Sequence, residues 1–543
     1  MRKYLPYLVI LTGIVGLLFV IGVMIFVGLG YDKKSNPQPQ ASSTAPGANP
    51  APNDPRFKGE PEPAPTAPAQ KDIGSIGQYQ YPTATAQTGT PTPLVLPETP
   101  TDLRLLWRYH SLVTAYLDHG KTNPYADQDA VNALYLYACR IPTTSLYPTD
   151  DEIRDAAESA LKKGSTDPVV RMLFITFKGG EEMIKNYDYF AHLEQPIQEM
   201  NLTKCHPYHC ADLLFTFSTD LHNAFFDTNT NTIPSNVDNA CKRHLDEAMR
   251  LMPAILADKS IPRAELYNLF LDCEKASASV KGDRKILFDE LMTNVAKIYP
   301  DSAILEGLKS RFYTDYAWDA RGTGFADKVS QRQQILFNER LELATQAVEK
   351  GYQLDPTDAS GPREMISIIM GMNQDQNLMS KWFKRAVTIE PENYKTYHKL
   401  MYSLTPRWGG SAESCVGVGK QCLKLAQSNP KKYGHLARML VDAHQYLSDE
   451  WDWNNPPNGY WTQGNVWSDL DATYQILTKL RPNSRVYRSE YALAAWRCQQ
   501  WQAAHDQFKL LGDKPVYSLF GGLEEYEKAV KTVNEKLKTT DKF

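Results

Sequence analysis

Two short stretches combine tryptophan, arginine and paired glycines, a set of residues that could hold an anion. The first stretch is 316–325 and the second is 404–411. Glycines leave backbone N–H groups exposed, arginine offers a planar fork of donors, and tryptophan offers a flat apolar face. If the fold brings the stretches together, they predict a pocket for an anion or a carboxylate-bearing ligand. Its residues would be Trp318, Asp319, Arg321, Gly322, Gly324, Arg407, Trp408, Gly409 and Gly410.

The same residues also have a structural interpretation. Each arginine could donate to carbonyl groups at a helix end, and each tryptophan could fill a gap between neighbouring repeats. Neither stretch has phosphate-loop spacing, because no lysine followed by serine or threonine comes after the glycines. The ligand pocket requires Arg321 and Arg407 to lie close together around a closed space, whereas the structural interpretation places them at separate helix ends.

A cluster at 205–210 is the most metal-like part of the chain. Zinc sites need four converging nitrogen or sulfur ligands, often from closely spaced cysteine pairs. Downstream, only Cys241 and His244 could complete such a set. A disulfide within the cluster and an ordinary helix start are the alternatives, so the sequence predicts neither a resident metal nor a cofactor. The weak candidate ligands are Cys205, His206, His209 and Cys210.

Four of the ten tryptophans gather between residues 451 and 467. An exposed aromatic platform there could stack on sugar rings or clasp a peptide, with Trp453 and Trp461 as the binding residues. The alternative is an aromatic insertion that seals two neighbouring repeats. The glycan-binding hypothesis fails if both of these tryptophans are buried.

No catalytic signature accompanies these clusters. A zincin helix and a Gly-x-Ser-x-Gly elbow are both missing, and the eleven histidines are scattered. The sequence therefore names no catalytic residue and favours a protein that is not an enzyme. The alternative is an enzyme or small-ligand receptor that uses Asp319, Arg321 and Arg407 in the Trp/Arg/Gly pocket.

Helical patterns run through the chain from Thr101 onward, and strict alternation of apolar and polar residues is nearly missing. Thr149 and Glu152 have the spacing of a capping box, and Gly164 stands where a helix would stop. The sequence therefore predicts an all-α fold. Further helices are expected at 237–257, 263–277, 285–298 and 336–352.

Two segments, thirty-five residues apart, both end in an acidic residue followed by proline. One ends in Asp355-Pro356 and the other in Glu390-Pro391. A repeat of this length predicts helix-turn-helix units, each of which buries its apolar face by stacking on the next unit.

The second half of the chain resembles degenerate tetratricopeptide repeats. In one unit Phe383, Ala386 and Pro391 match the family's second-helix positions, and the last unit has further matches. The resemblance implies a helical-repeat solenoid over 301–543 with a concave surface for a protein or peptide partner, whereas 101–300 is assigned to helices by pattern alone. The matches of the last unit are Ala492, Trp501, Ala504 and Phe508.

The Trp/Arg/Gly stretches also resemble an uncharacterised family of bacterial, membrane-associated, repeat-like proteins. The carrying motifs are Ala-Trp-Asp-Ala-Arg-Gly-x-Gly in 316–325 and Pro-Arg-Trp-Gly-Gly-Ser in 404–411. The resemblance implies helical repeats and a membrane location, but no activity.

The amino-terminal part predicts an anchor and a tether. The run from Tyr4 to Tyr31 has no charged residue and is long enough to cross a bilayer, which favours a transmembrane helix in 1–34 over a cleaved signal peptide. The charges at its ends favour a cytoplasmic N-terminus and an extracytoplasmic, periplasmic folded part. Segment 35–100 is rich in Pro, Ala and Thr and predicts a disordered linker.

Composition limits the partners. The chain has 543 residues and a formal net charge of −4, so no global field recruits nucleic acid. Its eight cysteines are too few and too scattered for a disulfide framework. The sequence therefore predicts a membrane-tethered helical-repeat scaffold that binds a protein or peptide partner.

Overall fold

The computed structural model describes residues 90–543 with internal gaps, and its elements are helices throughout. The all-α, repeat-like architecture is therefore confirmed for the described residues. The predicted division at residue 300 stays a prediction. The gaps are at 92, 98–101, 121–122, 145–146, 179–198, 201–204, 227–231, 282–283, 323, 325, 374, 453–454, 456–458 and 542.

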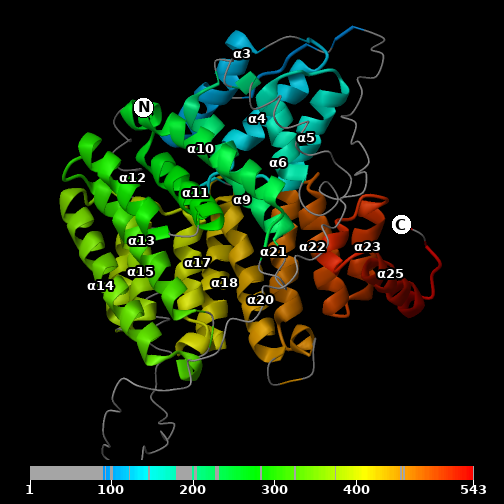
Figure 1. The fold of residues 1–543 in the computed structure, drawn as a ribbon. Helices are drawn as coiled ribbons and strands as arrows, with labels where there is room; N and C mark the ends of the chain where they lie inside the picture. Colours follow the sequence, from blue (N-terminus) through cyan, green and yellow to red (C-terminus); the bar gives the residue numbers. More distant parts are fainter. Residues whose placement is uncertain are drawn as a thin grey trace, which may run out of the picture.

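The helices follow one another with short connections (Figure 1). The first group is α2 (Leu103–Tyr109), the π-helical turn η2 (His110–Thr114), α3 (Ala115–His119), α4 (Asp127–Ala138), α5 (Asp150–Lys162), α6 (Pro168–Lys178), α9 (Pro207–Phe225), α10 (Ser235–Ala257), α11 (Arg263–Lys281) and α12 (Arg284–Ile298). The second group is α13 (Ala303–Arg321), α14 (Gln331–Leu354), α15 (Ser360–Gly371), α16 (Gln376–Ile389), α17 (Tyr394–Ser403), α18 (Ala412–Ser428), α19 (Pro430–Tyr433), α20 (Arg438–Asp452), α21 (Val466–Leu480), α22 (Arg485–Arg497), α23 (Trp501–Leu511), α24 (Tyr517–Phe520) and α25 (Leu523–Leu537). Short 3-10 turns lie between them at η3 (Ala326–Lys328), η4 (Pro406–Trp408), η5 (Gly434–Ala437) and η6 (Tyr460–Thr462).

The membrane part of the predicted fold class is corrected. Among the described residues, no helix has both the length and the apolar character that a bilayer span requires. Long helices such as α10 and α14 carry charged residues on the face opposite their apolar stripe, as amphipathic helices do. The predicted anchor, Tyr4 to Tyr31, and residues 35–89 of the predicted linker lie outside the described residues. On the finding for the described helices, we withdraw the single-pass membrane class and the extracytoplasmic, periplasmic location.

Local sequence signals explain where several helices begin and end. At α5 the Thr149 hydroxyl accepts from the Glu152 N–H, and the Glu152 carboxylate accepts from the Thr149 N–H at 2.9 Å, which is the predicted capping box. Gly164 follows this helix with a φ of 91°, a conformation that glycine adopts without strain. Ser330 and Gln333 form a second capping box at the start of α14.

In the middle of the chain, alternate helices α11, α13, α15 and α17 form a row, which is a feature of helical-repeat proteins. From α11 to α18 each helix packs on its neighbour in sequence, most extensively α13 on α14, and the pairs α11 and α13, α13 and α15, and α15 and α17 also pack together. We call α11, α13, α15 and α17 the inner row, and α14 and α16, which pack against that row, the outer row. In α16 the apolar face packs inward, burying Met379, Trp382, Phe383, Ala386 and Val387.

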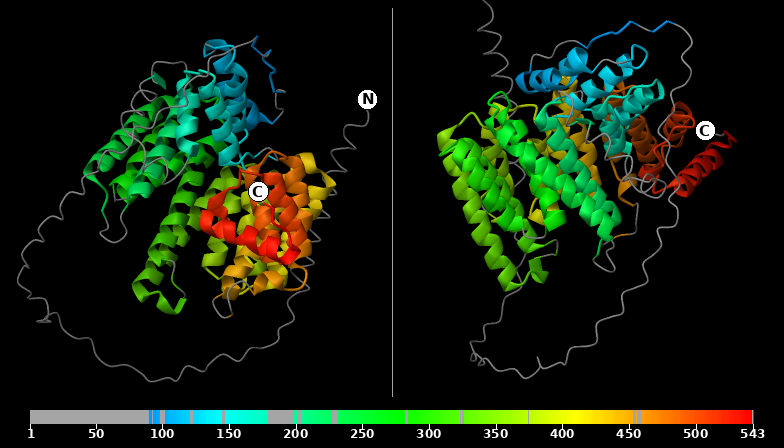
Figure 2. Two further views of the ribbon diagram at one scale, coloured as in Figure 1. Left: turned by 90° about the vertical axis from the view of Figure 1, so that its right-hand side faces the viewer. Right: turned by 45° about the horizontal axis from the view of Figure 1, so that its top comes forward.

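The first and last parts of the described chain meet. The Arg481 guanidinium lies 2.9 Å from the Glu152 carboxylate, and that of Arg485 lies 2.9 Å from Asp155. The Tyr394 N–H, at the start of α17, donates to the carbonyl of Pro142 at 3.0 Å. Figures 1 and 2 show the cyan helices of the amino-terminal part beside the orange helices of the carboxy-terminal part. The solenoid is therefore closed on this side.

Candidate functional site

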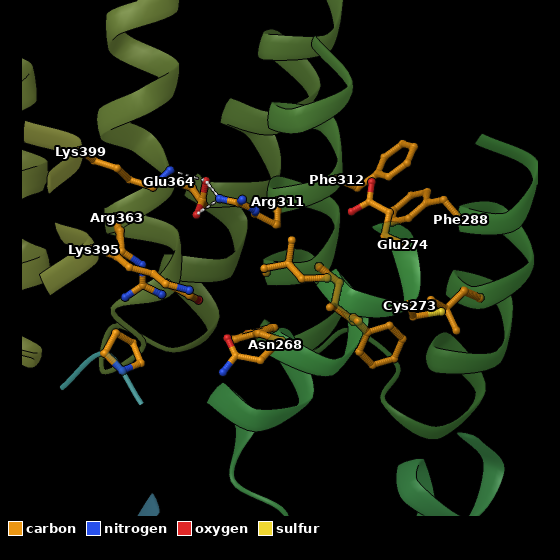
Figure 3. Close-up of a pocket in the computed structure, with 18 of the residues that line it drawn as sticks. Asn268, Cys273, Glu274, Phe288, Arg311, Phe312, Arg363, Glu364, Lys395 and Lys399 are labelled. Carbon is orange, nitrogen blue, oxygen red and sulfur yellow. Dashed lines mark hydrogen bonds and ion pairs between the residues drawn. The ribbon is translucent and has the colours of Figure 1, made fainter. Parts of the chain in front are cut away.

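The inner row of helices lines a cavity of about 730 Å³ (Figure 3). Helices α11, α13, α15 and α17 supply most of its wall, and α12 supplies half of the remaining lining residues. The volume falls within the range of roughly 300–1,000 Å³ that is typical of ligand sites. None of the residues of the predicted Trp/Arg/Gly pocket lines this cavity.

One wall of the cavity is apolar and comes from α11, α12 and α13. The rings of Phe288 and Phe312 stack there, with centroids 3.7 Å apart. Leu271 and Leu287 are only partly buried, so they present apolar surface to the cavity. The apolar side chains of this wall are Phe270, Leu271, Cys273, Leu287, Phe288, Leu291, Met292, Leu308 and Phe312.

The opposite wall carries cations from α13, α15, α17 and α20. On α17, Lys395 and Lys399 lie one turn apart, so both face the cavity. Figure 3 shows the labelled cations on one side of the cavity and the labelled phenylalanines on the other. The cationic residues of this wall are Arg311, Arg363, Lys395, Lys399 and Arg438.

A buried carboxylate joins two of these cations. Glu364 accepts from the Arg311 guanidinium at 2.9 and 3.1 Å and from the Lys399 ammonium at 3.1 Å. Burial on its own would raise the pKa of Glu364. The surrounding cations, Arg311 first and Lys399 second, outweigh burial and hold this pKa at about 2. Glu364 is therefore an anion that belongs to the wall itself.

The remaining arginines of the cavity also have carboxylate partners. Arg363 pairs with Glu390 at 3.1 Å. Arg438 makes a two-pronged contact with Glu490, with one pair at 2.8 Å. Arg284, at the edge of the apolar wall, contacts Glu274 and Asp319. These guanidinium groups are therefore neutralised by the protein.

Lys395 differs from these cations. Within the part of the chain that the structure describes, its ammonium group has neither a hydrogen bond nor an ion pair. The side chain is surrounded by protein but keeps a large accessible surface, because it projects into the cavity. Burial, and then repulsion from Arg363 and Arg311, lower the pKa of Lys395 to about 8. At neutral pH Lys395 therefore stays mostly charged and uncompensated.

The two Trp/Arg/Gly stretches come together as the pocket hypothesis requires. Trp318, near the end of α13, meets Trp408 of η4 edge to face, with ring centroids 5.4 Å apart. The Arg321 guanidinium lies 5.5 Å from the Trp408 ring and 5.7 Å from the Trp318 ring. The two stretches are therefore in contact through Trp318, Arg321 and Trp408.

Their detailed contacts nevertheless favour the structural interpretation. Arg321 donates to the carbonyls of Gly322 and Gly324 at 3.2 and 3.0 Å, next to a helix end. Arg407 is exposed, and its backbone N–H donates to Glu450 at 3.4 Å. Asp319 does not face this contact but pairs with Arg284 beside the cavity.

The glycines of these stretches have backbone roles. Gly322 and Gly409 have φ values of 73° and 80°, which favour glycine. At Gly410 an added Cβ would lie 2.0 Å from the carbonyl oxygen of Leu404, so only glycine fits. Close packing therefore explains these positions without a ligand.

The Cys/His cluster lies at the start of α9, and its side chains have separate partners. His206 Nε2 lies 3.0 Å from the Asp258 carboxylate, and His209 Nε2 lies 2.7 Å from the Ser111 hydroxyl. Cys205 and Cys210 are free thiols. Their mutual hydrogen bond, and then burial, raise the pKa of Cys205. Among the described residues, no group of three or more His, Cys, Asp or Glu side chains is arranged to hold a metal ion.

The aromatic cluster between 451 and 467 gives limited support to glycan binding. Trp461 is only 5% exposed and packs in an apolar core. Trp467 stacks on Tyr491 with ring centroids 6.1 Å apart. Trp453 lies outside the described residues. The described part of this cluster therefore seals neighbouring helices.

Comparison with protein-family models and with curated proteins finds no relative of this chain. The bacterial family suggested by the Trp/Arg/Gly motifs therefore receives no support.

The cavity was not predicted from the sequence, although one local signal was present. Lys395, His398 and Lys399 share one face of a helix that the repeat pattern places next to Pro391. A charged stripe on the inner face of a repeat indicates a binding surface. The other lining residues extend from Pro142 to Tyr487, and no sequence pattern connects them.

Proposed function

We propose that this protein is a helical-repeat binding protein that holds a short segment of a partner protein in its inner cavity. The observation that carries the proposal is the cavity itself, with a cationic wall facing an apolar wall. Helical-repeat solenoids use their concave surfaces for binding, and most of this cavity is lined by the inner row. The proposal includes no catalytic step.

The repeats are, in this proposal, degenerate tetratricopeptide repeats. Phe383 and Ala386 are buried in α16, the second helix of its hairpin, as the resemblance implies. Ala504 and Phe508 are fully buried in α23, at the matching place of the last unit. The likeness to the bacterial repeat-like family adds no activity.

A receptor for a small molecule is the second candidate function. The volume of about 730 Å³ and the largely apolar wall favour it. Such a receptor would use the same cavity and not the Trp/Arg/Gly contact, whose space is filled by Trp318, Arg321 and Trp408. The two candidates therefore share one site and differ in the ligand.

Affinity selection tests the proposal. Random hexapeptides in solution are incubated with the full-length protein, bound peptides are identified by mass spectrometry, and their affinities are measured by fluorescence anisotropy. Asn268→Trp fills the cavity from α11. Asn338→Trp, at an exposed position of the outer helix α14, is the matched control.

We expect Asn268→Trp to lower the affinity for the selected peptides at least tenfold. Asn338→Trp should leave this affinity unchanged. Circular dichroism and urea unfolding check that both variants keep the wild-type helicity and midpoint. If the peptides bind a folded Asn268→Trp protein as tightly as the wild type, they do not occupy the cavity and the proposal fails.

A further inference from the structure

We propose that the ligand of the inner cavity presents a single carboxylate to Lys395 and apolar groups to the α11–α12 wall, as the free C-terminus of a peptide with apolar last residues does. This inference rests on the proposed function and names the ligand class. Three features of the cavity carry it: an uncompensated cation, an obstruction beside that cation, and an apolar surface opposite.

The charge balance of the wall indicates an anion. Three of the lining residues carry a carboxylate, Glu274, Glu290 and Glu364. Six lining residues carry a guanidinium or ammonium group. Among the described residues, each of those cations except Lys395 has an ion-pair partner within the protein. One unpaired ammonium matches one carboxylate, since charge-assisted hydrogen bonds are the strongest that such a group makes. The cations are Arg284, Arg311, Arg363, Lys395, Lys399 and Arg438.

The surroundings of Lys395 favour a bound anion. Its cationic neighbours Arg363 and Arg311 add repulsion and the protein around it lowers its hydration, while the cavity leaves the side chain accessible to a ligand. Lys381, by contrast, is exposed on α16 in the outer row and does not line the cavity. A bound carboxylate offsets both costs at Lys395 without disturbing the paired cations around it.

The closure of the solenoid favours a chain end over a passing segment. Lys395 directly follows Tyr394, whose N–H donates to the carbonyl of Pro142. Pro142 and Tyr147 also line the cavity, so the amino-terminal part of the protein covers this side. A peptide whose carboxylate pairs with Lys395 can end there, with the amino-terminal part of the protein beside its last residue.

The opposite wall suits apolar side chains next to that carboxylate. Leu271 and Leu287 present partly exposed apolar surface. The carboxamide of Asn268 makes no hydrogen bond with the described residues, and in Figure 3 it lies between the labelled cations and the labelled phenylalanines. It can therefore pair with the last peptide group of a ligand whose side chains contact the leucines.

The test compares two soluble hexapeptide libraries, one with free C-terminal carboxylates and one with C-terminal carboxamides, on the full-length protein. Sodium dodecanoate is a third probe, because it carries a carboxylate on an apolar chain without a peptide. Lys395→Met removes the charge and Lys395→Arg restores it. Lys381→Met on the outer row is the control for the loss of one lysine.

We expect the carboxylate library to yield peptides with apolar last residues. Replacing the C-terminal carboxylate of these peptides by a carboxamide should lower their affinity at least tenfold. Replacing Lys395 by methionine in the protein should also lower it at least tenfold. Lys395→Arg should recover most of the affinity, and Lys381→Met should leave it unchanged.

Other outcomes separate the two proposals. If selected peptides depend on the cavity but bind equally well as carboxamides and to Lys395→Met, the carboxylate inference is overturned and the proposed function stands. If neither library yields a peptide whose affinity is lower for Asn268→Trp than for the wild type, the proposed function is overturned. Binding of dodecanoate alone, lost on Lys395→Met, would keep the carboxylate chemistry and overturn the peptide as its source.

Discussion

Two regions of the protein enclose cations among packed helices, and they treat the charge differently. In the amino-terminal part, Arg104 and Arg108 both pair with Glu265, which is fully buried, and Tyr208 donates to the same carboxylate at 2.7 Å. In the inner cavity, Lys395 has no such partner among the described residues. The first region is neutralised from within, whereas the second keeps one positive charge uncompensated.

The difference separates charges that hold the fold from a charge that is available to a ligand. Burial would raise the pKa of Glu265, but Arg104 and then Arg108 hold it at about 2, so the network stays ionised. Removing one member of a buried network leaves its partners unsatisfied, which is strongly destabilising. Removing Lys395 leaves no partner behind. The two regions should therefore respond to mutation in opposite ways.

The largest effect is expected for Glu265→Gln. It leaves Arg104 and Arg108 without a carboxylate, so the free energy of unfolding should fall by about 3–5 kcal/mol. Urea unfolding followed by circular dichroism measures the loss. Glu290→Gln, at an exposed position of the cavity rim, is the control and should change stability by less than about 0.5 kcal/mol. Equal losses in the two variants would contradict the comparison.

Glu364→Gln should have a smaller effect. Glu364 is 5% exposed and bonded to Arg311 and Lys399, so its loss should cost about 1.5–3 kcal/mol of stability. The cost should stay below that at Glu265 for two reasons. Arg311 retains its ion pair with Asp315 at 3.0 Å, and Arg311 and Lys399 line the cavity, where water can reach them. The same unfolding experiment checks the ranking, and a larger loss than at Glu265 would refute it.

The affinity for the selected peptides should depend on pH through Lys395. Its pKa in the free protein is about 8, and a bound carboxylate raises it. Above pH 8 the free protein loses the proton that binding needs, so affinity should fall by up to about tenfold per pH unit. Anisotropy titrations from pH 6.5 to 9.5 measure this slope. Lys395→Arg should abolish the fall, and a slope that survives in this variant would assign it to another group.

The smallest effect is the response of stability to Lys395→Met. The pKa of Lys395 in the folded protein, about 8, lies below its ordinary value of 10.5. Between these values the unfolded chain holds more protons, so the stability of the wild type rises with pH in this window. Lys395→Met should therefore be slightly more stable than the wild type at pH 7, and the gap should close toward pH 10.5. Unfolding midpoints at pH 7 and 10 give the comparison, and a variant that is less stable at pH 7 would show a structural role.

Much of the fold follows from local sequence signals. The helix expected at 263–277 is α11, Arg263–Lys281, and the one expected at 285–298 is α12, Arg284–Ile298. These predictions succeed because an amphipathic helix and its caps are encoded within a few turns. The helix expected at 336–352 begins earlier, at Gln331, because Ser330 supplies a capping box ahead of the apolar run.

The candidate site could be predicted only in part. Contact between the stretches of Trp318 and Trp408 was only a condition of the pocket hypothesis, and whether such a contact is hollow depends on how side chains from η4 and α13 fill it. The cavity depends on residues as distant as Pro142 and Tyr487, which meet only after the solenoid closes. Periodicity indicates which face of a helix is apolar, but not which helices lie across from each other.

Photo-crosslinking tests the central claim, that the cavity is where the ligand binds, most directly. A benzophenone amino acid replaces Leu271, on the cavity wall, or Leu343, which is 43% exposed on α14, in the full-length protein. We expect a selected carboxylate peptide to crosslink at position 271 through its last residues and not at position 343. A peptide that still binds but crosslinks only at position 343 would contradict the account.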